Sequence, residues 1–216
     1  MAFENLLNPE DVPGAIYTRK VAMHCAWRMQ KGRFFPKTII NVGVGAAHEL
    51  AIWKWLYPAA PILAIDPRPI GLTYKRRHRG KLTFVQAVAC EKETSSVVYC
   101  RRCHSLYCKS QNAHKDFWKD IKRVAIDDLV SSFEPPYFMW LDIEGGEVDA
   151  LKGAMQTLKQ AGWLCTELTN WIPGHRRSLL SLLRRQGFVL STLFSKDGLF
   201  YNKSFLMGRK KVRRLP

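Results

Sequence analysis

Short apolar runs rich in β-branched residues alternate along this chain with longer segments that have a helical spacing of apolar residues. This alternation is typical of parallel strands joined by helical crossovers, with helices on both faces of one sheet. The length of 216 residues favours one such domain over two. The predicted strands span 38–42, 62–65, 82–89, 137–141 and 163–168, and the predicted helices span 8–31, 46–56, 146–160 and 176–185.

The last part of the chain has a different pattern, which predicts an antiparallel hairpin. Two apolar runs, 188–194 and 199–207, flank Lys196-Asp197-Gly198, and Asp-Gly between apolar runs is a hairpin signal. A mostly parallel seven-stranded sheet closed by such a C-terminal hairpin resembles the class I methyltransferase fold, a single Rossmann-like α/β domain. We expect a helical segment at 1–36, the sheet domain at 37–207 and a basic tail at 208–216.

A glycine-rich turn follows the first predicted strand, with Asn41, Gly43 and Gly45 at the point where strand gives way to helix. Glycine permits a tight turn and lets a ligand approach the backbone without a Cβ in the way. Asp66, 23 residues after Gly43, ends the second strand and can accept hydrogen bonds from ribose hydroxyls. Adenosine-containing cofactors share this arrangement, so the residues alone leave S-adenosylmethionine, NAD and a plain strand-to-helix turn open.

Three acidic residues gather at the end of the fourth predicted strand. Asp142 and Glu144 follow the strand directly, and Glu147 begins the next helix. Carboxylates this close repel one another, so we expect at least one raised pKa unless cations compensate. Groups with shifted pKa values cluster at functional sites. The alternative is a solvated, acid-rich helix N-terminus, which the helix dipole favours.

The stretch from Asp142 to Ala154 resembles the FkbM-type methyltransferase family, in which an Asp-x-Glu-Gly-x-Glu run is followed by Leu-x-Gly-Ala. The resemblance covers about residues 37–207. At two positions the chain departs from the family pattern, because Asn41 stands where Asp is usual and Ala47 replaces a common Gly. Four further segments match in the same order: 65–67, 87–92, 124–129 and 165–168.

The resemblance implies S-adenosylmethionine as the cofactor, with methyl transfer to a hydroxyl oxygen of a sugar or small metabolite. By position, Gly43 and Gly45 would pass the methionine part of the cofactor, and Asp66 would hold its ribose. Val88 and Ala89 would flank the adenine. Asn41 would accept hydrogen bonds without offering the charge of the usual Asp.

The same resemblance gives the acids catalytic roles. Asp142 would lie nearest the transferred methyl group and the acceptor, as the base or as the group that orients the acceptor. Glu144 and Glu147 are the alternates for this catalytic role, and Glu167 would support them. His48, one turn into the first helix after the glycines, is a further candidate, although a surface position there is the more common case.

The chain carries 34 basic and 18 acidic residues, a formal net charge of +16, which favours polyanionic partners. Basic runs at 75–81 and 209–214 hold much of this charge. Besides a soluble basic surface, the charge raises two alternatives: a methyltransferase directed at RNA, and a non-catalytic nucleic-acid-binding relative of the fold. No Asn-Pro-Pro-Tyr or Asp-Pro-Pro-Tyr follows the fourth strand, which argues against methylation of base amino groups. The acid cluster has no role in hydride transfer, which argues against an NAD enzyme.

The six cysteines include a group that suits zinc by residue type and first spacing. Its members are Cys100, Cys103, Cys108 and His114, and free thiols in a reducing cytosol are the alternative. No apolar run approaches 18 residues and the first residues lack a secretory pattern, so we expect no membrane span and a cytoplasmic protein. The sequence leaves the acceptor and the oligomeric state open.

Overall fold

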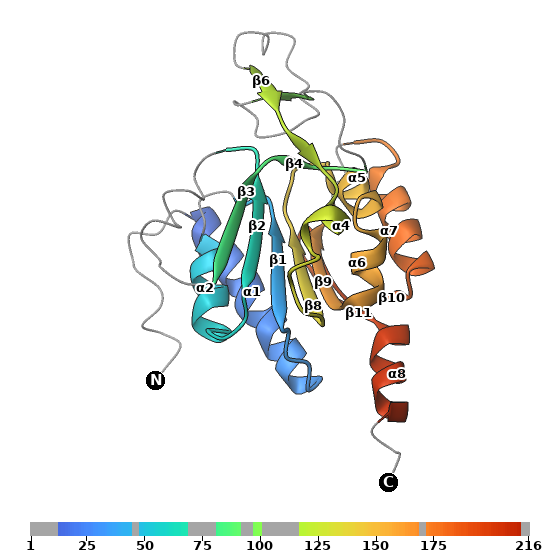
Figure 1. The fold of residues 1–216 in the computed structure, drawn as a ribbon. Helices are drawn as coiled ribbons and strands as arrows, with labels where there is room; N and C mark the ends of the chain where they lie inside the picture. The colour runs from blue at the N-terminus through green and yellow to red at the C-terminus, as the bar shows by residue number, and fades with distance from the viewer. Residues whose placement is uncertain are drawn as a thin grey trace.

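The computed structural model of the chain has a seven-stranded β-sheet with helices on both of its faces (Figure 1). It describes residues 13–44, 48–68, 81–91, 97–100, 117–168 and 172–212. The large sheet contains β1 (Thr38–Val42), β2 (Ile62–Asp66), β3 (Leu82–Gln86), β8 (Tyr137–Leu141), β9 (Ala161–Glu167), β10 (Phe188–Phe194) and β11 (Asp197–Asn202). The helices are α1 (Pro13–Lys31), α2 (His48–Leu56), α4 (Ile126–Leu129), α5 (Glu147–Lys152), α6 (Met155–Gln160), α7 (His175–Arg185) and α8 (Lys203–Val212).

The strand order across the large sheet is β10-β11-β9-β8-β1-β2-β3. Neighbouring strands from β9 to β3 are parallel, whereas β11 runs antiparallel to both β9 and β10. The predicted fold, a mostly parallel seven-stranded sheet with a C-terminal antiparallel hairpin, is therefore confirmed. The predicted helix start at Asn8 and residues 45–47 of the glycine turn lie outside the described residues.

Each face of the sheet buries an apolar cluster. One face is covered by α1 and α2, where Met29, Trp53 and Phe138 are buried. The other is covered by α4 to α7, where Leu151 and Leu183 are buried. β1, β2, β8 and β9 are buried along their whole length, as expected for parallel strands covered on both sides.

The predicted helix over 146–160 is two helices in the structure. α5 ends at Lys152 and is followed by Gly153, where a Cβ would overlap the carbonyl oxygen of Cys90, and α6 begins at Met155. The Asp127 carboxylate accepts hydrogen bonds from the backbone N–H groups of Gln156 and Thr157, at 2.9 and 2.8 Å. Asp127 thus caps α6 from a distant segment, which a local periodicity does not reveal.

The second apolar run of the hairpin, predicted over 199–207, is strand only as far as Asn202. The Asn202 Oδ1 accepts a hydrogen bond from the backbone N–H of Phe205 at 3.0 Å, which is an N-cap for α8. The run of apolar residues therefore continues from a strand into a helix.

The predicted strand 82–89 is also divided in the structure, because β4 (Val88–Ala89) leaves β3 and pairs with β7 (Arg123–Val124).

A further small sheet pairs β5 (Val97–Cys100) with β6 (Phe117–Ile121).

In the N-terminal segment, α1 shares an apolar cluster with Ile39 of β1. The division into 1–36, 37–207 and 208–216 stays a prediction. Among the described residues, no helix combines the length and the apolar character needed to cross a bilayer.

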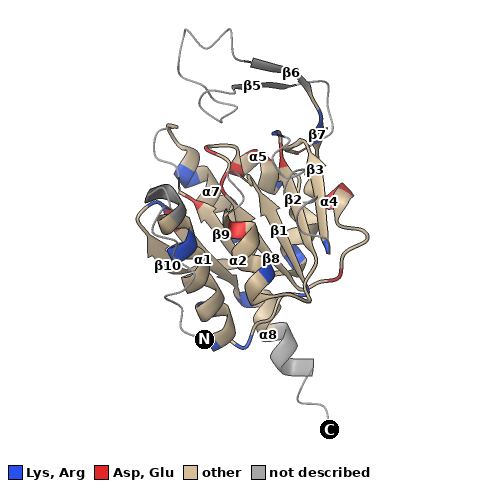
Figure 2. Ribbon diagram, turned by 90° about the vertical axis from the view of Figure 1, so that its left-hand side faces the viewer, with Lys and Arg blue, Asp and Glu red and all other residues tan. Residues whose placement is uncertain are grey.

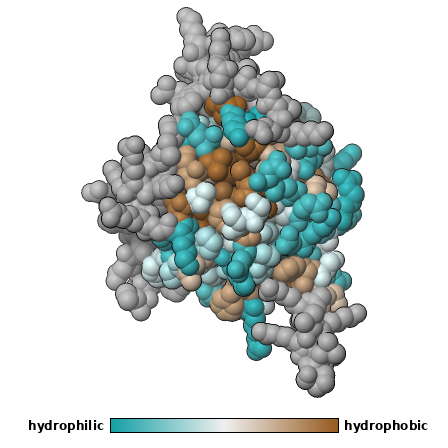
Figure 3. All heavy atoms as spheres, viewed as in Figure 1, coloured by the Kyte–Doolittle hydropathy of each residue, from teal (hydrophilic) through white to brown (hydrophobic). Residues whose placement is uncertain are grey.

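The surface is mostly hydrophilic on the face shown in Figure 3, as the composition leads one to expect. An apolar area lies in the upper half of that face, which is the half in which the parallel strands end. Polar residues and an apolar area thus meet near the carboxyl edge of the sheet. In open α/β sheets, this edge is where ligands bind.

Candidate active site

The glycine turn after β1 joins the carboxyl ends of three strands. Gly43 has a φ of +82°, and a Cβ there would overlap the carbonyl oxygen of Asp142 after β8. Its N–H donates to the carbonyl oxygen of Ile65 in β2, at 2.8 Å. The next N–H, of Val44, donates to Oδ2 of Asp66, also at 2.8 Å. This close approach requires the glycine, because the Asp142 carbonyl occupies the space that a Cβ would need. Gly45 lies outside the described residues.

Asp66 is buried at the end of β2 and already receives several hydrogen bonds. Besides the N–H of Val44, the backbone N–H of Arg68 donates to its Oδ1 at 2.7 Å. The Arg68 guanidinium donates from Nε to Oδ1 at 3.0 Å and from Nη2 to Oδ2 at 3.1 Å. Since a carboxylate has about four acceptor sites, these donors occupy its capacity. A ribose on Asp66 therefore requires the Arg68 side chain to move.

An acidic trio lies where β8 and β9 end. Asp142, Glu144 and Glu167 each offer a carboxylate oxygen, and these oxygens lie within 4.8 Å of one another. Acidic residues gather at this upper edge of the sheet in Figure 2. Glu144 has a φ of +51°, which is rare for a residue with a side chain and clusters at functional sites. Carboxylate oxygens suit Mg²⁺ and Ca²⁺, so the trio could hold a divalent cation.

Burial and mutual repulsion raise the pKa values of two members of the trio, Asp142 and Glu167. Burial raises the pKa of Asp142 to about 6, and the negative charges of Asp197 and Glu144 add to that rise. Burial likewise raises the pKa of Glu167 to about 7, with repulsion from Glu144 and Asp142. The positive charge of Lys196 lowers both pKa values. A carboxyl group with a pKa near 6 can accept a proton during a reaction at neutral pH.

The hairpin supplies residues that the sequence reasoning treated only as a turn. Lys196 Nζ lies 3.2 Å from Oε1 of Glu167, and Asp197 pairs with Glu167 in the β11–β9 register. The Tyr17 hydroxyl of α1 donates to Oδ2 of Asp197 at 2.8 Å. In the sequence, the tripeptide Lys196-Asp197-Gly198 indicated only a hairpin. The pairing of β11 with β9 is what places it beside Glu167.

Glu147 is completely buried and holds the loop after β8. Its Oε1 accepts the N–H groups of Ile143 and Gly145, at 3.4 and 3.2 Å. Its Oε2 lies 2.8 Å from Nε2 of His175, the first residue of α7. Both oxygens therefore face protein groups, which supports a positioning role for Glu147.

Asn41 lies fully buried in β1, and its Nδ2 donates to Oε1 of Glu49 in α2 at 3.2 Å. Burial raises the pKa of Glu49 to about 8, with repulsion from Asp142 and Asp66. The sequence reasoning did not single out Glu49. Its signal is weak, because an acid in the first turn of a helix is ordinary.

The remaining candidates lie in β4, at the start of α2, in β5 or outside the described residues. Val88 and Ala89 are buried in β4, and Ala89 belongs to the apolar core. His48 is the first residue of α2 and is partly exposed. For the zinc candidates, Cys100 has a described backbone in β5 only, and Cys103, Cys108 and His114 lie outside the described residues.

A parallel sheet that ends in an antiparallel hairpin, with its polar residues at the carboxyl edge, is the architecture of the class I methyltransferases. The family model named Methyltransferase FkbM domain matches residues 44–190, which is more than half of the chain. The protein thus belongs to the FkbM methyltransferase family, and its cofactor is S-adenosylmethionine.

Solved structures of low sequence identity share the fold. A Klebsiella pneumoniae protein inferred to be an O-methyltransferase matches with a TM-score of 0.51 and 9% identity, over 92% of this chain and 85% of that one. A Staphylococcus aureus protein inferred to be a caffeoyl-CoA O-methyltransferase matches with a TM-score of 0.54 and 7% identity, over 84% and 82%. No curated protein matches the sequence.

The residues at the carboxyl edge fit this cofactor. The turn at Gly43 lies against the backbone of Asp142, and the acidic trio beside it offers negative charge to a cationic sulfonium. Oδ1 of Asn41 and Oε2 of Glu167 are buried acceptors without a hydrogen-bond partner in the described structure. Unpaired buried acceptors are costly, so a ligand that donates to them would be stabilised.

Replacing Asp66 by Ala is expected to weaken binding of S-adenosylmethionine by about tenfold or more, because the ribose loses a charged acceptor. Calorimetric titration measures this directly. Arg68→Ala is the matched control, since it breaks the same ion pair but keeps the carboxylate and frees two of its acceptor sites. Its affinity should equal or exceed that of the wild type. Equal losses in both variants would mean that Asp66 only anchors Arg68.

Proposed function

We propose that this protein transfers the methyl group of S-adenosylmethionine to a hydroxyl oxygen of a sugar or small metabolite. The observation that carries the proposal is the trio of Asp142, Glu144 and Glu167 beside the turn at Gly43. A hydroxyl must lose its proton as the carbon–oxygen bond forms, and these carboxyl groups are the acceptors available at that edge. The cofactor supplies a methyl group already activated by a positive sulfur.

Asp142 is the base in this proposal. Its pKa of about 6 leaves it ionised at neutral pH while keeping it more basic than a free aspartate. Lys196 keeps the carboxylate charged until the acceptor's proton arrives. Glu147 and His175 hold the loop that carries Asp142 and Glu144, so the base keeps its place. Alignment of acceptor and methyl group supplies the rest of the rate.

The experiment is a screen with methyl-labelled S-adenosylmethionine against sugars, sugar alcohols and small hydroxylated metabolites. The proposal predicts a labelled methyl ether, which survives alkali, on one hydroxyl of an accepted compound. A labelled methyl ester would be released by alkali, and a labelled amine would be recognised by mass and by its basicity. Either of those as the main product would contradict the proposal.

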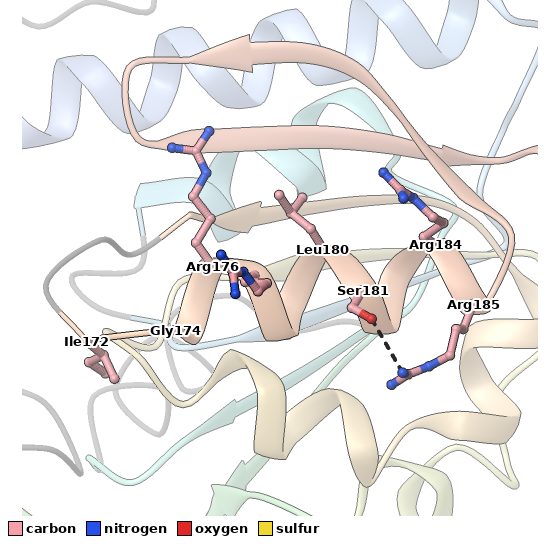
Figure 4. Close-up of a pocket in the computed structure, with 8 residues that line it drawn as sticks. Ile172, Gly174, Arg176, Leu180, Ser181, Arg184 and Arg185 are labelled. Carbon is pink, nitrogen blue, oxygen red and sulfur yellow. Dashed lines mark hydrogen bonds between the residues drawn. The ribbon is translucent and has the colours of Figure 1, made fainter.

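A second candidate is a methyltransferase directed at RNA, and an arginine-lined groove along α7 favours it. The groove encloses about 800 Å³. Figure 4 shows Arg176, Leu180 and Arg184 on one side of α7, while Arg185 turns to Ser181, which accepts its hydrogen bond at 3.4 Å. Residues eight apart on a helix are roughly 12 Å apart, so the guanidinium groups of Arg176 and Arg184 could contact two different phosphates of one strand. The groove is lined by Ile172, Gly174, Arg176, Arg177, Leu180, Ser181, Arg184 and Arg185.

Under this candidate, the double variant Arg176→Gln/Arg184→Gln should bind single-stranded RNA more weakly. The slope of log affinity against log salt should fall by about 1.4, because two phosphate contacts are lost. The control is Lys152→Gln/Lys159→Gln, which removes the same charge from α5 and α6. If both double variants behave alike, net charge alone explains the binding and the groove gives no support to an RNA acceptor.

A further inference from the structure

Two buried polar side chains, Asn41 and Glu49, bracket the glycine turn, and Glu49 has no role in the steps described above. Asn41 is the fourth of the five residues of β1, and Glu49 is the second residue of α2. They lie on opposite sides of the turn and are joined by the hydrogen bond from Asn41 Nδ2 to Glu49 Oε1. Asn41 is fully buried and Glu49 is 5% exposed.

The surroundings of Glu49 are unusual for a buried acid. The donors to its carboxyl group, its own backbone N–H and the Asn41 amide, are both neutral, and the charges of Asp142 and Asp66 that act on it are negative. A buried carboxyl group is normally paired with a base or satisfied by several donors. Here a carboxyl group is buried beside an amide instead of a base, and the Oδ1 of Asn41 is buried without a hydrogen-bond partner in the described structure. A cation with N–H donors that binds beside this pair would stabilise the Glu49 carboxylate and satisfy the unpaired acceptor of Asn41.

The methionine end of S-adenosylmethionine is such a cation, with a positive sulfur and an ammonium group. We propose that Asn41 and Glu49 act together as its binding pair, with the Glu49 carboxyl losing its proton as the cation binds and so supplying the negative charge, and with the Asn41 Oδ1 accepting a hydrogen bond. Glu49 is then a positioning residue that provides from α2 the charge that the neutral amide at the end of β1 lacks. This inference rests on the cofactor assigned above.

The amide and the carboxyl group can be exchanged between positions 41 and 49 with little change in side-chain size. In Asn41→Asp/Glu49→Gln the carboxylate moves to the strand and the amide to the helix, and one amide-to-carboxyl hydrogen bond remains possible with its direction reversed. Glu49→Gln alone leaves two amides and no carboxyl. The charge-based role predicts loss in the single variant and recovery in the double variant.

The experiment is calorimetric titration of the wild type and both variants with S-adenosylmethionine and with S-adenosylhomocysteine, whose sulfur is neutral. We expect Glu49→Gln to weaken S-adenosylmethionine binding by about tenfold and S-adenosylhomocysteine binding by less, so that the preference for the cation falls. The exchange variant should restore that preference to within about threefold of the wild type. Glu134→Gln, at an exposed acid far from the site, is the control for charge alone.

Several outcomes would overturn the inference. One is a Glu49→Gln variant with an unchanged preference, and another is an exchange variant that folds but does not recover it. If Glu49→Gln does not fold, the exchange variant still tests the inference. Its preference for S-adenosylmethionine over S-adenosylhomocysteine must match that of the wild type. A wild type that binds neither compound would overturn the assigned cofactor as well, whereas wild-type binding with unaffected variants would overturn this inference alone.

Discussion

Asp142→Asn is expected to slow methyl transfer by about 10²–10⁴-fold, the usual contribution of a general base. The amide has nearly the same size as the carboxylate but cannot take the acceptor's proton. Affinity for S-adenosylmethionine should change by less than about threefold, because Asp66 and the glycine turn are intact. Single-turnover kinetics and calorimetry separate the two effects. The control is Asp149→Asn, at an acid in α5 that pairs with the exposed Lys152.

The pH profile gives an independent readout of the same residue. A base works in its ionised form, so the wild-type rate should rise with pH through about 6, where Asp142 loses its proton. Asp142→Asn should lack that rise, although a second group such as Glu167, with a pKa of about 7, can still titrate. A variant with wild-type turnover and an unchanged profile would show that Asp142 is not the base.

Gly43→Ala is expected to lower the free energy of unfolding by about 3 kcal/mol or more. A side chain at a φ of +82° costs about 1–2 kcal/mol, and the added methyl group would also displace the backbone at Asp142. Since Asp142 moves with it, any folded fraction should have lost most of its turnover. Denaturant titration measures the stability, and the transfer assay measures the activity.

Gly174→Ala is the matched control for that substitution. Gly174 also has a positive φ, +75°, but a Cβ there meets nothing within 4 Å. We therefore expect a loss of about 1–2 kcal/mol with turnover preserved. Similar losses of stability in both variants would mean that the contact between Gly43 and the Asp142 carbonyl has no energetic weight.

The sheet was predictable because buried parallel strands have a strong local signature. β1, β2 and β8 are short, mostly apolar runs that end at Gly43, Asp66 and Asp142, and the structure places them as expected. The errors occurred where a side-chain hydrogen bond decides where a helix begins. Asp127 caps α6 from another segment, and the Asn202 side chain turns an apolar run from strand into helix.

The candidate site was partly predictable for the same reason. Asp142 and Glu144 adjoin in sequence, so the acid cluster was visible, and Glu167 followed from the end of its own strand. Lys196 reaches Glu167 only through the β11–β9 pairing, and Glu49 reaches Asn41 only across the turn. No local pattern encodes those two contacts. The acidic Glu147 was proposed as catalytic, and its buried hydrogen bonds now support a positioning role.

The most direct test of this account is a calorimetric titration of the purified protein with S-adenosylmethionine, with NAD as the contrast. The account predicts one site per chain with about micromolar affinity for S-adenosylmethionine and no binding of NAD. It also predicts that Asp66→Ala weakens this binding and that Asp142→Asn does not. Binding of NAD in preference to S-adenosylmethionine, or binding of neither, would contradict the assignment of this edge of the sheet as a methyltransferase site.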